Sequence, residues 1–210
     1  MNINDIINEV VKIRLELPNM PTNPIDFDLL PVKPYIGDEN IKLIIIGQDP
    51  TIRNKQQRKH IETTLNLDKN GALKKYIEDI CLKLGISMRN IYATNIYKYF
   101  YSIPPADTPD VLLRHKDPNI KLLKKELECF NDSSIITLGE PVLRLITDDR
   151  EIKVRDYWNF QEKGFGYISS EDNVLGHYIF PFPHQPSMRK HLYSSNFDNY
   201  IDYMKRVVLK

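Results

Sequence analysis

Residues 41–50 read Ile41-Lys42-Leu43-Ile44-Ile45-Ile46-Gly47-Gln48-Asp49-Pro50. The nearly continuous apolar run over 41–46 is typical of a parallel strand that is buried on both faces. The run ends at Gly47, so the three residues that follow form a turn at the carboxyl end of the strand. Because Pro50 favours an extended backbone at Asp49, this turn can direct the carboxylate into a cleft.

Three further runs of this kind follow, at residues 91–95, 135–138 and 178–180. Stripes of apolar residues at helical spacing lie between and after these runs, over 73–84, 120–130, 142–146 and 197–208. Strands that alternate with helices predict a parallel sheet covered on both faces. We therefore expect an α/β fold, a three-layer α/β/α sandwich with a central, mostly parallel four-stranded sheet.

The remaining segments complete one predicted domain over residues 1–210. Apolar residues at helical spacing predict a first helix over 3–16, and five prolines in 18–38 exclude regular helix there. We expect residues 1–40 to form this helix and a proline-rich wrap over the domain. Residues 147–176 are irregular and polar, and they are expected to be an insertion.

Composition limits the classes of function. The chain has a formal net charge of +1, so binding to nucleic acid would require a local basic surface. The absence of a long apolar run argues against a membrane span, and the polar residues 1–9 argue against a secretory signal. Cys81 and Cys129 predict two buried thiols and neither a zinc nor an iron–sulfur site. We expect a cytoplasmic monomer with no metal or cofactor.

Polar residues follow the predicted strands at their carboxyl ends, where ligands bind in such folds. These residues are Gln48, Asp49, Asn95, Gly139, Glu140 and His184. The Asn95 amide offers both a donor and an acceptor, which suits the edge of a nucleobase. His184 lies between Pro183 and Pro186, which stiffen its loop. Spacing alone also fits a turn-capping role for Asp49 and Asn95 and a surface role for His184.

Two basic groups flank these candidate turns. The first comprises Arg53, Lys55, Arg58, Lys59 and His60, and the second comprises Arg189, Lys190 and His191. Either group can be a solvated face, and together they would also suit a track for phosphates beside a pocket. Nearby acidic residues partly offset the positive charge: Glu62, Asp68, Asp148, Asp149 and Glu151.

Four ordered segments of the sequence resemble uracil-DNA glycosylases. Gly47-Gln48-Asp49-Pro50 resembles the first motif of that family, and His184-Gln185-Pro186-Ser187 resembles its second motif, usually written H-P-S. Residues 91–98, followed by Pro104-Pro105, look like the middle of the iron–sulfur branch, and residues 136–143 are similar to another segment of that branch. The resemblance spans residues 41–208.

The resemblance implies a site and an activity. Asp49 would orient water and support the sugar cation, His184 would hydrogen-bond the developing oxyanion of the base, and Asn95 would read the base. Gly47, Gln48 and Pro50 would complete the substrate-binding turn. Pro186 and Ser187 would belong to the loop that grips the DNA backbone. From the two basic groups, we expect Arg53, Arg189 and Lys190 to contact its phosphates. Residues of these types suit hydrolysis of the N-glycosidic bond of uracil or another deaminated base, because the transition state carries charge of both signs.

The chain departs from the family at several positions. Thr51 and Ile52 stand where the common family has Tyr and His, Gln185 interrupts the second motif, and Tyr99 replaces a cluster cysteine. Leu65 or Leu67 is nearest to the place of an aromatic residue that stacks on the base. A residue that wedges into the duplex would be Met188 or Leu192, and either also suits the core. Two alternatives therefore remain: a non-catalytic base-binding module, and a hydrolase of free nucleosides or nucleotides.

Overall fold

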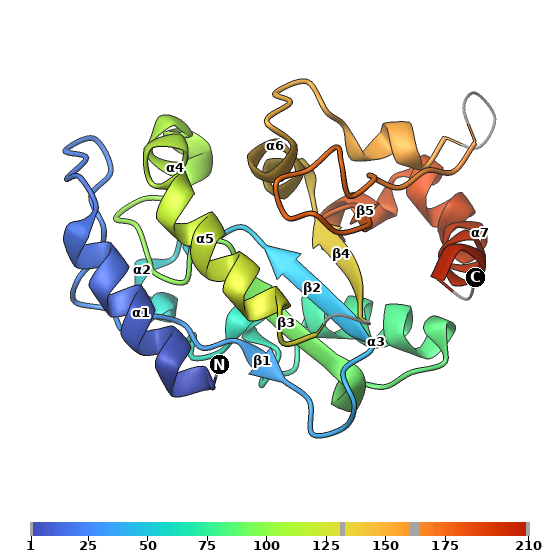
Figure 1. Ribbon diagram of the computed structural model, residues 1–210, viewed down its shortest axis with the longest axis horizontal. Helices are drawn as coiled ribbons and strands as arrows, with labels where there is room; N and C mark the ends of the chain where they lie inside the picture. The colour runs from blue at the N-terminus through green and yellow to red at the C-terminus, as the bar shows by residue number, and fades with distance from the viewer. Residues whose placement is uncertain (1, 131–132, 160–163, 209–210) are drawn as a thin grey trace.

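A computed structural model describes residues 2–130, 133–159 and 164–208 and has an α/β architecture built on one sheet (Figure 1). The strands are β1 (Tyr35–Ile36), β2 (Leu43–Gly47), β3 (Ile91–Asn95), β4 (Ser134–Leu138) and β5 (Ile179–Phe182). Their order is β1-β3-β2-β4-β5, with β1 antiparallel to β3 and the other neighbouring pairs parallel. The predicted fold class is confirmed.

The prediction of four strands is wrong by one, because the sheet has five. The additional strand, β1, consists of two residues in the proline-rich segment and pairs with Tyr92 and Ala93 at the edge of the sheet. A two-residue strand is too short to show alternating hydrophobicity, which is why the sequence does not reveal it.

Helices cover both faces of the sheet. The α-helices are α1 (Ile3–Glu16), α2 (Lys55–Arg58), α3 (Ala72–Leu84), α4 (Asp110–Arg114), α5 (Lys116–Leu127), α6 (Glu140–Thr147) and α7 (His191–Val208). Short 3-10 helices are η1 (Thr64–Asn66), η2 (Met88–Asn90), η3 (Pro105–Asp107), η4 (Val154–Tyr157) and η5 (Gln185–Arg189). Since β3 and β4 lie on opposite sides of β2, right-handed crossovers put α3 and α5 on opposite faces.

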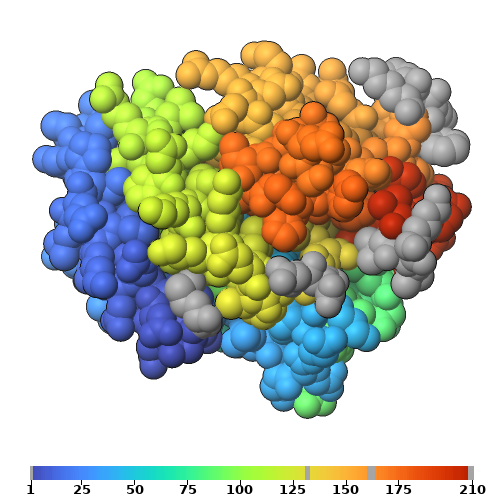
Figure 2. Space-filling view, in the orientation of Figure 1, coloured from blue at the N-terminus to red at the C-terminus, as the bar shows by residue number. Residues whose placement is uncertain are grey.

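The outer layers are completed by the two terminal helices. Helix α1 packs on α5, and α7 packs on α3. Figure 2 shows the blue N-terminal segment lying directly against the yellow-green residues of α4 and α5. The predicted first helix, 3–16, matches α1, whose start is fixed by a capping box between Asn2 and Asp5. Helix α3 ends at Gly85, whose φ of 74° is the left-handed conformation that glycine favours.

The region 147–176, expected to be an insertion, contributes to the core where it is described; residues 160–163 lie outside the described part. Trp158 is fully buried, and its indole Nε1 donates a hydrogen bond of 2.6 Å to the carbonyl of Pro181 in β5. Its ring stacks on Tyr200 of α7, with centroids 4.2 Å apart. This region therefore joins the end of the sheet to the last helix.

The two cysteines differ from expectation. Cys81 is buried in α3, and burial raises the pKa of its thiol to about 12. Cys129 is exposed, so the prediction of two buried thiols is wrong for this residue. Cys129 follows α5 and lies next to Phe130, whose ring packs on Tyr92 of β3 with centroids 4.6 Å apart. Among residues 2–130, 133–159 and 164–208, no helix has the length and apolar character needed to cross a membrane.

Candidate active site

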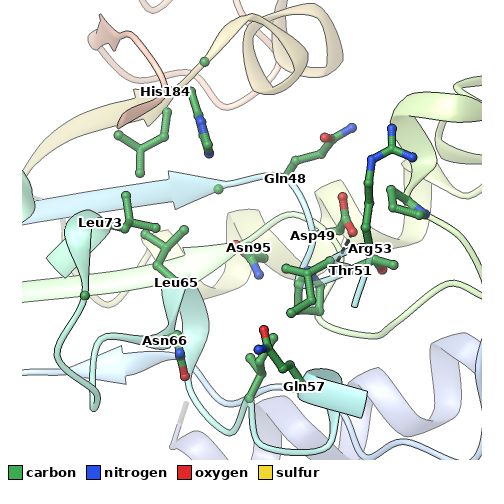
Figure 3. Close-up of a pocket in the computed structure, with 18 of the residues that line it drawn as sticks. Gln48, Asp49, Thr51, Arg53, Gln57, Leu65, Asn66, Leu73, Asn95 and His184 are labelled. Carbon is green, nitrogen blue, oxygen red and sulfur yellow. Dashed lines mark hydrogen bonds between the residues drawn. The ribbon is translucent and has the colours of Figure 1, made fainter. Parts of the chain in front are cut away.

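A cavity of about 820 Å³ opens at the carboxyl ends of the four parallel strands (Figure 3). Its lining includes residues 47–53 after β2, Asn95 at the end of β3, Gly139 after β4 and His184 after β5. Cα register explains the convergence, because Gly47 pairs with Asn95 and the ladder continues through Ile96 N–H to the Gly47 carbonyl at 2.9 Å. The cavity therefore collects residues that lie up to 137 positions apart, from 47 to 184.

Gly47 makes room for the Asn95 side chain. A Cβ atom at position 47 would lie 2.4 Å from Asn95 Oδ1, closer than a real side chain tolerates. Asn95 is 1% exposed, and its Oδ1 atom is buried without a hydrogen-bond partner among the described residues. A buried amide oxygen without a partner is costly, so Asn95 Oδ1 is a candidate atom for binding a ligand in the cavity.

Asp49 lines the same cavity as this amide, and the pKa of its carboxyl group is raised. Its Oδ1 accepts a hydrogen bond of 2.8 Å from the Thr51 N–H, shown in Figure 3. Burial raises the pKa of the carboxyl group to about 6, although the Thr51 N–H and the positive charge of Arg58 both lower it. Above pH 6 the group is therefore mainly an anion that is poorly solvated, which suits stabilisation of a nearby positive charge.

The two residues that follow Pro50 have different environments. Thr51 turns its hydroxyl oxygen to the Tyr101 N–H, from which it accepts a hydrogen bond of 2.9 Å. Ile52 lines the cavity and is 37% exposed. Thr51 therefore joins the turn after β2 to the segment that follows β3.

His184 faces the cavity from the end of β5 (Figure 3). The Tyr76 hydroxyl of α3 donates a hydrogen bond of 3.2 Å to the preceding carbonyl, that of Pro183. Gly139, with a φ of 88°, allows close approach, since a Cβ there would lie 3.4 Å from His184 Cβ. Partial burial lowers the pKa of the imidazole below its usual value. At neutral pH His184 is therefore an uncharged group with one N–H to donate.

The wall opposite Arg53 in Figure 3 carries an unusual turn. Leu65 and Asn66 both have positive φ, 58° and 54°, which is uncommon for residues other than glycine. The turn brings Leu65 onto the cavity wall, with its Cδ2 near Gly47, whereas Leu67 is fully buried in the core. Of these two leucines, Leu65 is therefore the one that lines the cavity. The surface that it contributes there is aliphatic rather than aromatic. Asn66 also lines the cavity, and its Oδ1 is buried without a partner in the described chain.

The residues expected to contact the DNA backbone lie outside the cavity, except for Arg53. Pro186, Ser187 and Arg189 belong to η5, and Lys190 follows it; Arg189 and Lys190 are exposed. Arg53 is 78% exposed and forms a two-pronged ion pair with Asp107, at 3.0 and 3.1 Å. The candidate wedge residues Met188 and Leu192 are half-buried and pack against the hydrophobic core.

Two buried cations near the site were not identified from the sequence. Arg58, assigned there to an exposed basic group, is 1% exposed, so that assignment is wrong for this residue. Lys98 is fully buried and paired with Glu126 at 2.6 Å. The sequence held a signal for Lys98, because this residue lies between apolar and aromatic neighbours in Ile96-Tyr97-Lys98-Tyr99-Phe100-Tyr101. Arg58 had no such signal, since its neighbours Lys55 and Lys59 are exposed.

The position of a family cluster cysteine is occupied by Tyr99, which is fully buried and whose hydroxyl accepts a hydrogen bond of 3.0 Å from Asn119. Within the described ranges, no group of three or more His, Cys, Asp or Glu side chains is arranged to hold a metal ion.

Comparison with known families agrees with this geometry. Residues 34–205 match the family model described as the Uracil DNA glycosylase superfamily. The chain belongs to this superfamily. No curated protein matches the chain in sequence. Membership in the Uracil DNA glycosylase superfamily supports a glycosylase-type function that acts on DNA. The match covers every strand of the sheet and every residue of the cavity described above.

Proposed function

We propose that this protein is a DNA glycosylase that hydrolyses the N-glycosidic bond of uracil or another deaminated base in DNA. The observation that carries the proposal is the shared cavity of Asp49, Asn95 and His184, each at the end of a different strand. A base within a duplex has to leave the stack before it can enter such a cavity. The proposed substrate is therefore an extrahelical or unpaired nucleotide.

Cleavage of an N-glycosidic bond separates charge. The sugar gains positive charge and the leaving base gains negative charge, so groups that stabilise both ends accelerate the reaction. The ionised Asp49 carboxylate would face the sugar and orient the attacking water. The neutral His184 imidazole would donate its N–H to an oxygen of the departing base. Neither role requires His184 to be protonated, which fits its lowered pKa.

Recognition of the base falls to Asn95. Its amide can donate through Nδ2 and accept through Oδ1, a pattern complementary to a carbonyl next to a ring N–H. Deamination creates that pattern in uracil, hypoxanthine and xanthine alike. The small Thr51 side chain, the aliphatic Leu65 and the volume of about 820 Å³ favour a site that also admits bases larger than uracil. Gly47, Gln48 and Pro50 complete the turn around the base.

Binding of the DNA backbone is assigned to the exposed residues beside the cavity. Pro186, Ser187, Arg189 and Lys190 would grip phosphates on the His184 side, and Arg53 would do so on the Asp49 side. Because Arg53 is already paired with Asp107, we expect its contribution to be smaller than that of Arg189 and Lys190.

The test is incubation of the purified protein with single- and double-stranded DNA that contains uracil, hypoxanthine or xanthine, followed by detection of abasic sites. We expect release of at least one of these bases, with turnover reduced about 1,000-fold in Asp49→Asn and DNA affinity little changed.

The possible failures separate the alternatives. Salt-sensitive DNA binding without base release would indicate a non-catalytic binding module. Release from free nucleosides and not from DNA would indicate a nucleoside hydrolase. Equal base release by the wild type and Asp49→Asn would contradict the proposed role of Asp49.

A further inference from the structure

Arg58 is a buried cation in a helix whose other basic residue faces solvent. It is the last residue of α2 and is 1% exposed, whereas Lys55 is exposed. Burial of a guanidinium group is costly unless its N–H groups are hydrogen-bonded. The hydrogen-bond partners of Arg58 therefore indicate its structural role.

The guanidinium group joins two segments of the cavity wall. Its Nε donates a hydrogen bond of 2.7 Å to the carbonyl of Ile52, in the turn that carries Asp49. Its Nη1 donates to the carbonyls of Tyr101 and Ser102, at 2.8 and 3.1 Å, in the segment that follows β3. The planar fork of arginine can satisfy these three acceptors at once, which a lysine ammonium cannot do with the same geometry.

A second link lies between the same two segments. The Thr51 hydroxyl accepts from the Tyr101 N–H, and the Thr51 N–H donates to Asp49 Oδ1. One series of hydrogen bonds therefore runs from Tyr101 through Thr51 to the Asp49 carboxylate. Arg58 links the same two segments a second time, through the carbonyl of Ile52. We call these contacts of Arg58 and Thr51 the clamp on the Asp49 turn.

The charge of Arg58 is not neutralised by an ion pair with any described residue, since its partners are carbonyl oxygens. Its field reaches the carboxylates of Asp26 and Asp49, and it lowers the pKa of Asp49. The phenols of Tyr97, Tyr99 and Tyr101 also interact with the Asp49 charge. The other titratable residues that line the cavity with Asp49 are Arg53, His60, Lys69, Lys74 and His184. Burial raises the pKa of each phenol, so all three stay neutral in the range that concerns Asp49.

We propose that Arg58 is a positioning residue that clamps the Asp49 turn to residues 101–102 and supplies a permanent positive charge that favours the ionised carboxylate. The role in catalysis rests on the proposed function, whereas the effect on Asp49 does not. Arg58 itself does not line the cavity and is not expected to touch the substrate.

The experiment compares Arg58→Gln, Arg58→Lys and the wild type, with Val10→Ala as a control for loss of stability. Val10 is fully buried in α1 and is not one of the residues that line the cavity. The Asp49 carboxyl group is titrated by carbon-13 NMR, which requires no activity. We expect its midpoint to rise by about 1 unit in Arg58→Gln, since an opposite charge is removed, and to move by less than about 0.3 units in Arg58→Lys and Val10→Ala.

Base release gives the second readout. Both Arg58 variants are expected to lose kcat by about tenfold or more with a smaller change in KM, because the clamp is loosened in each. Val10→Ala is expected to keep the wild-type kcat at a temperature where it is folded. If Arg58→Gln does not fold, Arg58→Lys alone tests the clamp through kcat.

Two results would overturn the proposal: an Asp49 midpoint that is the same in Arg58→Gln as in the wild type, or a wild-type kcat in folded Arg58→Lys. If the wild type releases no base, the proposed function fails, and the NMR titration still tests the action of Arg58 on Asp49.

Discussion

Arg58 and Lys98 are both buried cations behind the cavity, one for each of the two segments that carry Asp49 and Asn95. Lys98 donates to the Asn95 carbonyl at 2.8 Å and pairs with Glu126, which also accepts hydrogen bonds from Tyr92 and Thr94. Among the described residues, the hydrogen bonds of Arg58 go to the carbonyl oxygens of Ile52, Tyr101 and Ser102.

The difference between them lies in how the charge is balanced. The charge of Lys98 is compensated by Glu126 within 2.6 Å, so the pair presents little net field to the cavity. The charge of Arg58 has no such partner among the described residues and acts on Asp49. On the Asn95 side, the Lys98–Glu126 ion pair holds the segment in place and its two charges compensate each other. On the Asp49 side, Arg58 holds the segment in place and its uncompensated charge also acts on Asp49.

Lys98→Met breaks the ion pair between Lys98 and Glu126 and should have the largest effect on stability. It leaves Glu126 buried without a counter-charge, and we expect a loss of about 3–5 kcal/mol in the free energy of unfolding, measured with urea. Lys116→Met is the matched control, because its partner Asp148 is 65% exposed, and its loss should stay below about 1 kcal/mol. Equal losses in the two variants would show that the Lys98 pair is not special.

Gly47→Ala tests the close packing of the Asn95 side chain against Gly47. The new Cβ would lie 2.4 Å from Asn95 Oδ1, so the amide or the strand has to shift. We expect a loss of about 1–3 kcal/mol in stability and a lower rate of base release. Gly71→Ala meets no atom within 4 Å and should stay within about 0.5 kcal/mol of the wild type. An unchanged rate in Gly47→Ala would contradict the close fit of Asn95.

Asp49→Asn should stabilise the protein while it slows turnover about 1,000-fold. The pKa of Asp49 is raised from 3.8 to about 6 on folding, so the folded state loses stability as the pH rises through this interval. The variant lacks this cost, and we expect it to gain about 3 kcal/mol at pH 8 and nothing below about pH 4. A difference that does not change with pH would contradict the raised pKa.

Much of the fold could be predicted because the signals are local and repeated. Apolar runs ending in polar turns located the four parallel strands, and the apolar stripe over 73–84 located α3. The carboxyl-end rule then brought Asp49, Asn95 and His184 to one edge, and all three line one cavity.

The remaining features depend on contacts between distant segments. Arg58 looks like its exposed neighbours until its carbonyl partners at 101 and 102 are known. Leu65 and Leu67 have the same character in sequence, and only the left-handed turn at 65–66 decides which one enters the cavity. The exposed Cys129 and the short β1 were missed for the same reason, because neither is determined by a local pattern.

The single-turnover rate of base release between pH 5 and 8 tests the proposed role of Asp49 most directly. If the ionised Asp49 carboxylate stabilises the transition state, the wild-type rate should rise about tenfold per pH unit and level off above about pH 6. Asp49→Asn should be slow throughout and should lack this rise. A wild-type rate that is flat over the range, or a rise that persists in Asp49→Asn, would contradict the assignment of Asp49.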